Sequence, residues 1–150
     1  MAKFTFKLEA LLELRTREED RLRMEYVKLV RARTGIEEFL RMQQGRITEQ
    51  KSSMREQLVG RVDTDALRTH AHGVLGVMRE AQTAAIELAG LARRQDKARF
   101  ELVSAQGRRR AVELIRERRL SEWKVEQERR EVADLDDLVS CAAGRKEPSS

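Results

Sequence analysis

Few side chains in this sequence could carry out catalysis or bind a metal. His70 and His72 are the only histidines, and residues two apart on a helix point to different sides, so they cannot share a metal ion. Cys141 is the single cysteine, which excludes an internal disulfide and a cysteine-based metal cluster. The glycines form no GxxxxGK[ST] phosphate loop, and no catalytic constellation is recognisable. The sequence therefore predicts a non-enzymatic protein with no cofactor, metal or small-molecule substrate.

A cluster of arginines could instead bind the phosphates of a nucleic acid. Glu113 and Glu117 lie inside this cluster, and residues 120–140 hold seven acids against three bases, so DNA would be repelled next to it. The interleaved aromatics of single-strand binders are absent. A nucleic-acid binder stays the less favoured alternative to a protein-binding surface. The cluster consists of Arg108, Arg109, Arg110, Arg116, Arg118 and Arg119.

The composition and the spacing of apolar residues predict an all-α fold. Charged residues make up 38% of the chain and aromatics only 4%, which leaves little material for a compact core. The single proline, Pro148, interrupts nothing before the end of the chain. Apolar residues recur at spacings of three, four and seven, as expected for one helical stripe. The stripe comprises Leu22, Tyr26, Leu29, Ile36, Leu40, Ile47, Met54 and Leu58.

A break in this stripe predicts a helical hairpin. Gly60 and the capping residues that follow it place a turn at residues 59–64, between a first arm of about residues 5–58 and a second of about residues 65–143. Long helices joined by a short turn fold back antiparallel, so we expect a two-helix coiled-coil hairpin forming a single domain, with the chain ends at one tip. Gly73 and Gly76 suggest a bend or a short helix near residues 64–80. Residues 144–150 are expected to form a flexible tail.

The distribution of charge bears on where the protein works. The segment Met1–Leu14 contains charged residues and therefore no signal-peptide core, and no apolar run approaches the roughly 20 residues needed to cross a bilayer. We therefore expect a cytoplasmic protein that meets membranes only through a partner.

Both ends of the sequence resemble the FliJ family, a small cytoplasmic coiled-coil component of bacterial flagellar type III export. The N-terminal resemblance runs from Lys3 to Arg15, with an aromatic-basic-Leu-x-x-Leu-Leu opening, and continues through Arg17, Glu18, Glu19 and Asp20. The C-terminal resemblance comprises residues 116–119, Trp123, residues 128–131 and residues 135–137. Residues 73–90 depart from the family by being richer in Gly and Ala than a continuous coiled coil prefers.

The resemblance implies a function through partners. It implies a protein similar to the central stalk of rotary ATPases, in or near the flagellar export ATPase ring. It also implies contact with the cytoplasmic domain of the export-gate membrane protein and with export chaperones, at the inner-membrane export apparatus. The ATPase would carry the nucleotide chemistry. An alternative is a general helical chaperone or scaffold that binds export cargo through an Ala-rich seam.

The candidate partner-binding residues lie toward the shared tip. Continued toward the N-terminus, the apolar stripe is interrupted by charged residues, namely Arg15, Glu18 and Glu19. These charges indicate either contact with a partner or a solvated coiled-coil end. Phe4 and Phe6, together with a tryptophan, could anchor an interface or close the hairpin. The full predicted set is Phe4, Phe6, Leu8, Arg15, Glu18, Glu19, Arg116, Arg118, Arg119, Trp123, Arg129, Arg130 and Glu131.

Overall fold

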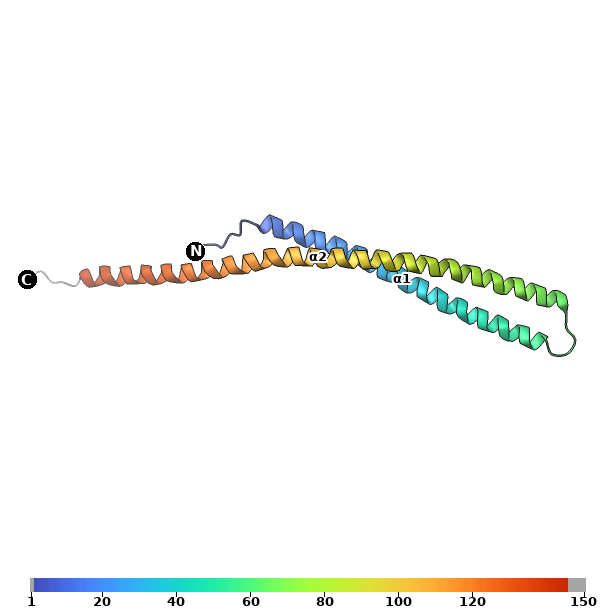
Figure 1. The fold of residues 1–150 in the computed structure, drawn as a ribbon. Helices are drawn as coiled ribbons and strands as arrows, with labels where there is room; N and C mark the ends of the chain where they lie inside the picture. Colours follow the sequence, from blue (N-terminus) through green and yellow to red (C-terminus); the bar gives the residue numbers. More distant parts are fainter. Residues whose placement is uncertain (1, 146–150) are drawn as a thin grey trace, which may run out of the picture. The chain divides into compact units, whose positions relative to one another are not determined.

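Two long helices make up nearly all of the structure. The computed structural model describes residues 2–145, which form α1 (Glu9–Gln57, 49 residues) and α2 (Thr64–Gly144, 81 residues), as Figure 1 shows. No strand occurs within the described range. The predicted all-α, antiparallel two-helix fold is therefore confirmed. None of these helices is long and apolar enough to cross a membrane.

The contacts within the chain divide it into two units, and both helices contribute to each. The hairpin unit comprises residues 20–104, in which the larger part of α1, the turn and the start of α2 pack together. The tip unit comprises residues 1–19 and 105–150, in which the start of α1 runs antiparallel to the later part of α2.

The turn of the hairpin unit is formed by residues 58–63. Gly60 has a φ of 89°, a left-handed conformation that glycine adopts without strain and that commonly ends a helix. Asp63 then caps α2, because its Oδ1 accepts hydrogen bonds from the backbone N–H groups of Asp65 at 3.0 Å and Ala66 at 3.3 Å. These two residues explain why the chain stops one helix and starts the next here.

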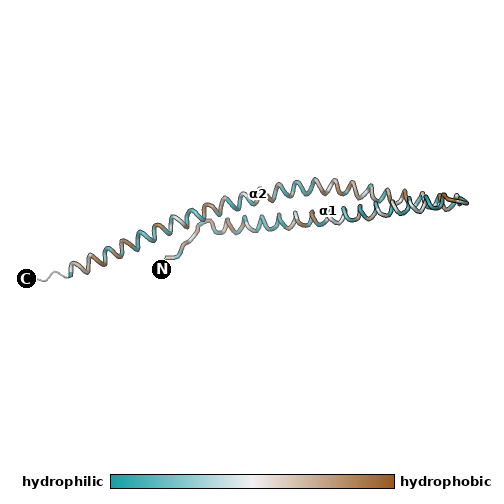
Figure 2. The backbone as a smooth tube through the Cα atoms, turned by 90° about the horizontal axis from the view of Figure 1, so that it is seen from below, coloured by the Kyte–Doolittle hydropathy of each residue, from teal (hydrophilic) through white to brown (hydrophobic). Residues whose placement is uncertain are grey.

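The seam between the helices follows a seven-residue repeat. In α2, Val77, Ala84 and Leu91 are buried at steps of seven, and Ala105 and Val112 continue the same row in the tip unit. A strict step of seven corresponds to 3.5 residues per turn, the repeat of a coiled coil. Figure 2 shows the resulting mixture of hydrophobic and hydrophilic residues along both helices.

Several seam positions of the hairpin unit carry polar side chains. Gln43 is 1% exposed and donates a hydrogen bond to the Glu80 carboxylate at 2.9 Å. The imidazole of His70 lies between the side chains of Gln50 and Gln57, at 3.1 and 3.0 Å. Polar groups in a coiled-coil core favour one register at a cost in stability. The Ala-rich seam is therefore held together by specific hydrogen bonds as well as by packing.

The structure departs from the sequence-based expectation at two places. The first arm was expected from about residue 5, and α1 begins at Glu9, after a segment without regular structure in which Phe6 is buried. No separate short helix occurs at residues 64–80, since α2 is continuous through Gly73 and Gly76. The propensity cost of two glycines is small against the packing of Val77 and its neighbours along a helix of this length. The expected tail at residues 144–150 lies outside the described residues from residue 146 onward.

Candidate partner-binding site

The aromatic residues of the tip unit meet across the two ends of the seam. The rings of Phe4 and Trp123 lie 5.9 Å apart between centroids at an interplanar angle of 60°, a tilted arrangement that aromatic pairs favour. Both side chains are half-buried, and Phe6 beside them is buried. Phe4 belongs to residues 2–6, which form neither helix nor strand and precede α1.

A groove of about 500 Å³ opens between this N-terminal segment and α2. Apolar side chains form much of its wall, and Lys7 and Arg119 place two cations beside the single carboxylate of Glu122. The groove brings together five predicted site residues that are far apart in sequence. They are Phe4, Phe6, Leu8, Arg119 and Trp123, which line it with Thr5, Lys7, Ile115 and Glu122.

Ion pairs between the helices fix the register of the tip unit. The Arg116 guanidinium contacts the Glu9 carboxylate at 3.2 Å, and Arg108 contacts Glu18 at 3.2 Å. Next to Arg108, Arg109 pairs with Glu19, whose side chain is only 3% exposed. Each pair joins a carboxylate of α1 to a guanidinium of α2, so a slip of one turn would break all of them together.

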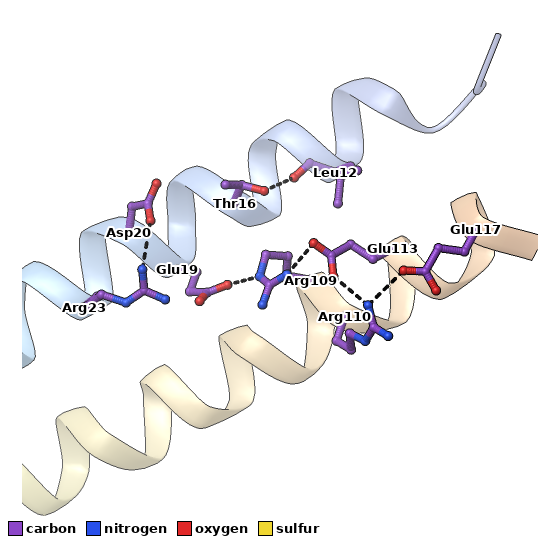
Figure 3. Close-up of polar contacts among 9 residues, drawn as sticks. All are labelled: Leu12, Thr16, Glu19, Asp20, Arg23, Arg109, Arg110, Glu113 and Glu117. Atoms are coloured by element: carbon purple, nitrogen blue, oxygen red, sulfur yellow. Dashed lines mark hydrogen bonds and ion pairs between the residues drawn. The ribbon is translucent and has the colours of Figure 1, made fainter. Parts of the chain in front are cut away.

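The Glu19–Arg109 pair belongs to a longer network along α2, shown in Figure 3. Arg109 also binds Glu113, which binds Arg110 at 3.1 Å, and Arg110 binds Glu117 at 3.1 Å. Hydrogen bonds from Arg109 and Arg110 lower the pKa of Glu113, while the carboxylates raise the pKa of both arginines. These hydrogen bonds favour the ionised form of Glu113, and the carboxylates offset the positive charge of Arg109 and Arg110.

The structure gives several predicted site residues partners within the chain. Glu18 binds both Arg15, at 3.2 Å, and Arg108. These contacts account for the charges that interrupt the apolar stripe without requiring a partner protein. Further along α2, Arg118 pairs with Glu122 at 3.6 Å and Arg130 with Glu126 at 3.2 Å. Arg129 and Glu131 are exposed, and no ion pair joins either of them to another residue within 2–145. A contact between any of these residues and another protein remains a prediction.

Helix α2 continues well beyond the aromatic pair, and we call residues 124–144 the extension. The second arm, expected over about residues 65–143, is the longer of the two, since α2 continues from Trp123 to Gly144, roughly 30 Å at 1.5 Å per residue. Residues 128–145 are all exposed. The extension carries large apolar side chains that are between 46% and 68% exposed, namely Val125, Val132, Leu135, Leu138 and Val139.

Most of these apolar side chains face away from the seam. At 100° per residue, Val132 lies about 180° around the helix from Trp123 and Val139 about 160°. A longer α1 following the same seam would therefore not cover them. The sequence contains a signal for this face, because Val125, Val132 and Val139 recur at steps of seven.

Within residues 2–145, no group of three or more His, Cys, Asp or Glu side chains could hold a metal ion. Two surfaces of the tip unit are open to a partner. They are the aromatic groove and the exposed apolar face of the extension.

Comparison with known proteins agrees with this architecture. A solved structure from Chlamydia trachomatis, described as the YscO homolog CT670, superimposes with a TM-score of 0.62 at 17% identity. The match covers 97% of this chain and 100% of that one, which supports the fold. Curated protein sequences gave no match. The family model described as the flagellar FliJ protein matches residues 4–148, almost the whole sequence. The chain therefore belongs to the FliJ family and is a helical component of flagellar type III export.

Proposed function

We propose that this protein binds the ring of the flagellar export ATPase through its tip unit, as the central stalk does in rotary ATPases. In this proposal it acts in the cytoplasm, at the inner-membrane export apparatus. It links the ATPase to the cytoplasmic domain of the export gate and to export chaperones. The ATPase hydrolyses the nucleotide, and this chain contributes binding surfaces alone.

The exposed apolar face of the extension is the observation that carries the proposal. Leu135, Leu138 and Val139 are each at least 60% exposed on a helix that has no neighbouring helix there within the described residues. Clustered exposed apolar side chains on a helix mark interaction surfaces. A partner that encloses the extension would bury these side chains and stabilise the helix.

The aromatic groove supports the same assignment. Its Phe4 and Trp123 rings offer the type of anchor that is enriched at protein interfaces, and Lys7 and Arg119 beside them favour an acidic partner surface. The groove and the extension both belong to the tip unit. One partner could therefore contact both surfaces.

The observations favour neither alternative function. A cargo chaperone that used the Ala-rich seam would need it open, but Ala84 and Ala105 are buried between the helices. A nucleic-acid binder that used the arginine cluster would need free cations there, but Arg109 and Arg110 are paired with glutamates. Phosphate binding would have to break these pairs first.

ATPase turnover tests the proposal. The purified flagellar export ATPase of the same organism is assayed with increasing amounts of the wild type, of Leu135→Glu/Leu138→Glu, and of the control Met42→Glu. Met42 is 57% exposed on α1 in the hairpin unit, so the control also places a charge at an exposed apolar position. We expect the wild type and the control to raise turnover and the extension variant to fail, with equal helicity of all three by circular dichroism. Unchanged turnover with the wild type, or full stimulation by the extension variant, would refute the proposal.

A further inference from the structure

The hairpin unit carries one strongly exposed aromatic side chain. Phe100 on α2 is 74% exposed, and it is the one aromatic of the six in the chain that is classed as exposed. Ala98 and Leu102, two residues before and after Phe100 in the sequence, face the seam. Phe100 is on the opposite side of the helix and therefore points away from α1. Val103, three residues later and 57% exposed, adds a second apolar group to the same side. Neither group has a role in packing the hairpin.

Two cations, Arg93 and Lys97, lie within about 60° of Phe100 around α2, and Arg94 and Arg99 lie farther round the helix on either side. Arg93, Arg94, Lys97 and Arg99 are exposed, and no ion pair within residues 2–145 includes any of them. In the same unit Arg33 pairs with Glu37 at 2.9 Å, while Arg41 and Arg79 also make no ion pair within residues 2–145. In the tip unit, the arginines of α2 at residues 108–110 form ion pairs with glutamates.

The spacing of these cations is unfavourable for the helix by itself. Lys97 follows Arg93 by four residues and Arg94 by three, the two separations at which side chains on a helix are neighbours. Like charges at these separations destabilise a helix, and Asp96, three residues after Arg93, and Glu101, four residues after Lys97, offset part of this repulsion. An acidic partner would remove the repulsion and cover Phe100 at the same time.

We propose that the side of α2 formed by Arg93, Lys97, Phe100 and Val103, which we call the basic aromatic face, binds an acidic amphipathic helix of a partner protein. The partner helix lays an apolar stripe over Phe100 and Val103 and directs carboxylates to Arg93 and Lys97. Aromatic and arginine side chains together are typical of the energetic centre of an interface. This site belongs to the hairpin unit and does not depend on binding of the ATPase by the tip unit.

A helix suits this face better than a membrane or a nucleic acid does. Phe100 and Val103 occupy about one turn of α2, whereas an interfacial membrane helix needs an apolar face that continues along its length. Glu101 and Asp96 alternate with the cations, so a continuous run of phosphates would meet repulsion. Carboxylates at helical spacing on a partner can contact the cations individually.

Binding of a designed peptide to the full-length protein tests this inference. The probe is a fluorescein-labelled helical peptide with leucines along one face and flanking glutamates, and its counterpart carries lysines in place of the glutamates. Fluorescence anisotropy gives the dissociation constant for the wild type, Phe100→Ala and Lys97→Glu. The controls are Met24→Ala, at a 64% exposed position on α1, and Arg41→Glu, an exposed residue that makes the same change of charge.

We expect the wild type to bind the acidic peptide and not the basic one. Phe100→Ala should weaken binding roughly fivefold or more, and Lys97→Glu roughly tenfold, as truncations and charge reversals at interface centres do. The controls should stay within about twofold of the wild type, as changes outside an interface do. Circular dichroism checks that all variants are equally helical. Equal weakening by Arg41→Glu would show an effect of net charge alone and overturn the inference. An affinity of Phe100→Ala equal to that of the wild type would also overturn it. The same holds if the wild type does not bind the peptide but binds phosphatidylglycerol vesicles or single-stranded DNA in a way that depends on Phe100.

Discussion

Glu19 and Arg109 form an ion pair at positions where the seven-residue repeat of the seam would otherwise bring two apolar side chains together. Glu19 precedes the buried Leu22 by three residues, and Arg109 follows Leu102 by seven. Apolar seams tolerate sliding, whereas a charged pair in the seam is satisfied in one register only. We interpret this pair as the feature that aligns the start of α1 with α2 and so positions the aromatic groove.

Removal of one member of this pair should destabilise the tip unit. Glu19→Ala leaves Arg109 without its seam partner and should lower the melting temperature by several degrees. The double variant Glu19→Leu/Arg109→Leu continues the apolar stripe and should melt at or above the wild-type temperature, because apolar replacement of a buried pair is often neutral or stabilising. Thermal unfolding followed by circular dichroism measures both. A double variant less stable than Glu19→Ala would contradict the assignment of these positions to the seam.

The lowered pKa of Glu113 predicts a specific dependence of stability on pH. Its carboxylate stabilises the fold fully at pH values above its ordinary pKa of 4.5. As the pH falls from there through the lowered folded-state pKa, Glu113 becomes protonated and the stabilisation is lost. Glu113→Gln should therefore melt below the wild type at neutral pH, and the difference should vanish in acid. A difference that persists to about pH 2, where carboxyls are protonated, would contradict this account.

Much of the fold could be predicted from the sequence because its signals are local. The step between apolar residues indicates helix, and Gly60 with Asp63 indicates the turn, since a left-handed glycine and a capping carboxylate act on their own neighbours. The start of α1 could not be predicted in this way. It depends on the burial of Phe6 in the tip unit, which is a contact between residues distant in sequence.

The glycines of the chain should respond oppositely to substitution by alanine. Gly73 and Gly76 lie within α2, and an added Cβ at either would meet no atom within 4 Å. Gly73→Ala and Gly76→Ala should each stabilise the protein by roughly 0.5–1 kcal/mol, because alanine loses less backbone freedom on folding. Gly60→Ala should destabilise it by about 1 kcal/mol, because its φ is positive. Urea unfolding measures all three, and destabilisation by the two helical substitutions would show that the helix is interrupted there.

The single tryptophan reports directly on the aromatic groove. Phe4→Ala removes the ring beside Trp123 and exposes the indole to water, so the emission maximum should move to longer wavelength. Leu14→Ala is the matched control, since Leu14 is 59% exposed on α1 in the same unit and should leave the emission unchanged. An unchanged spectrum in Phe4→Ala would mean that the N-terminal segment does not pack on Trp123 in solution.

The candidate site was only partly readable from the sequence. The aromatics could be assigned to one end because the hairpin topology brings Phe4 near Trp123. The role of Glu19 could not, because a charged residue in an apolar stripe has the same appearance whether it meets a partner protein or an arginine of the other helix. That distinction depends on the register of α1 against α2, which the repeat of small and charged residues leaves open.

The central claim is that the tip unit binds the ATPase ring through the extension. Cross-linking from Cys141 tests this claim most directly. Cys141 is the one cysteine of the chain and is exposed on the extension, so a benzophenone maleimide can be attached to it alone. The labelled protein is mixed with the flagellar export ATPase and irradiated, and the products are separated by mass. The control carries the label in the hairpin unit, as Cys141→Ser/Ser52→Cys. We predict an adduct of one chain with one ATPase subunit from Cys141 and none from the control; no adduct from Cys141, or adducts of equal yield from both positions, would contradict the account.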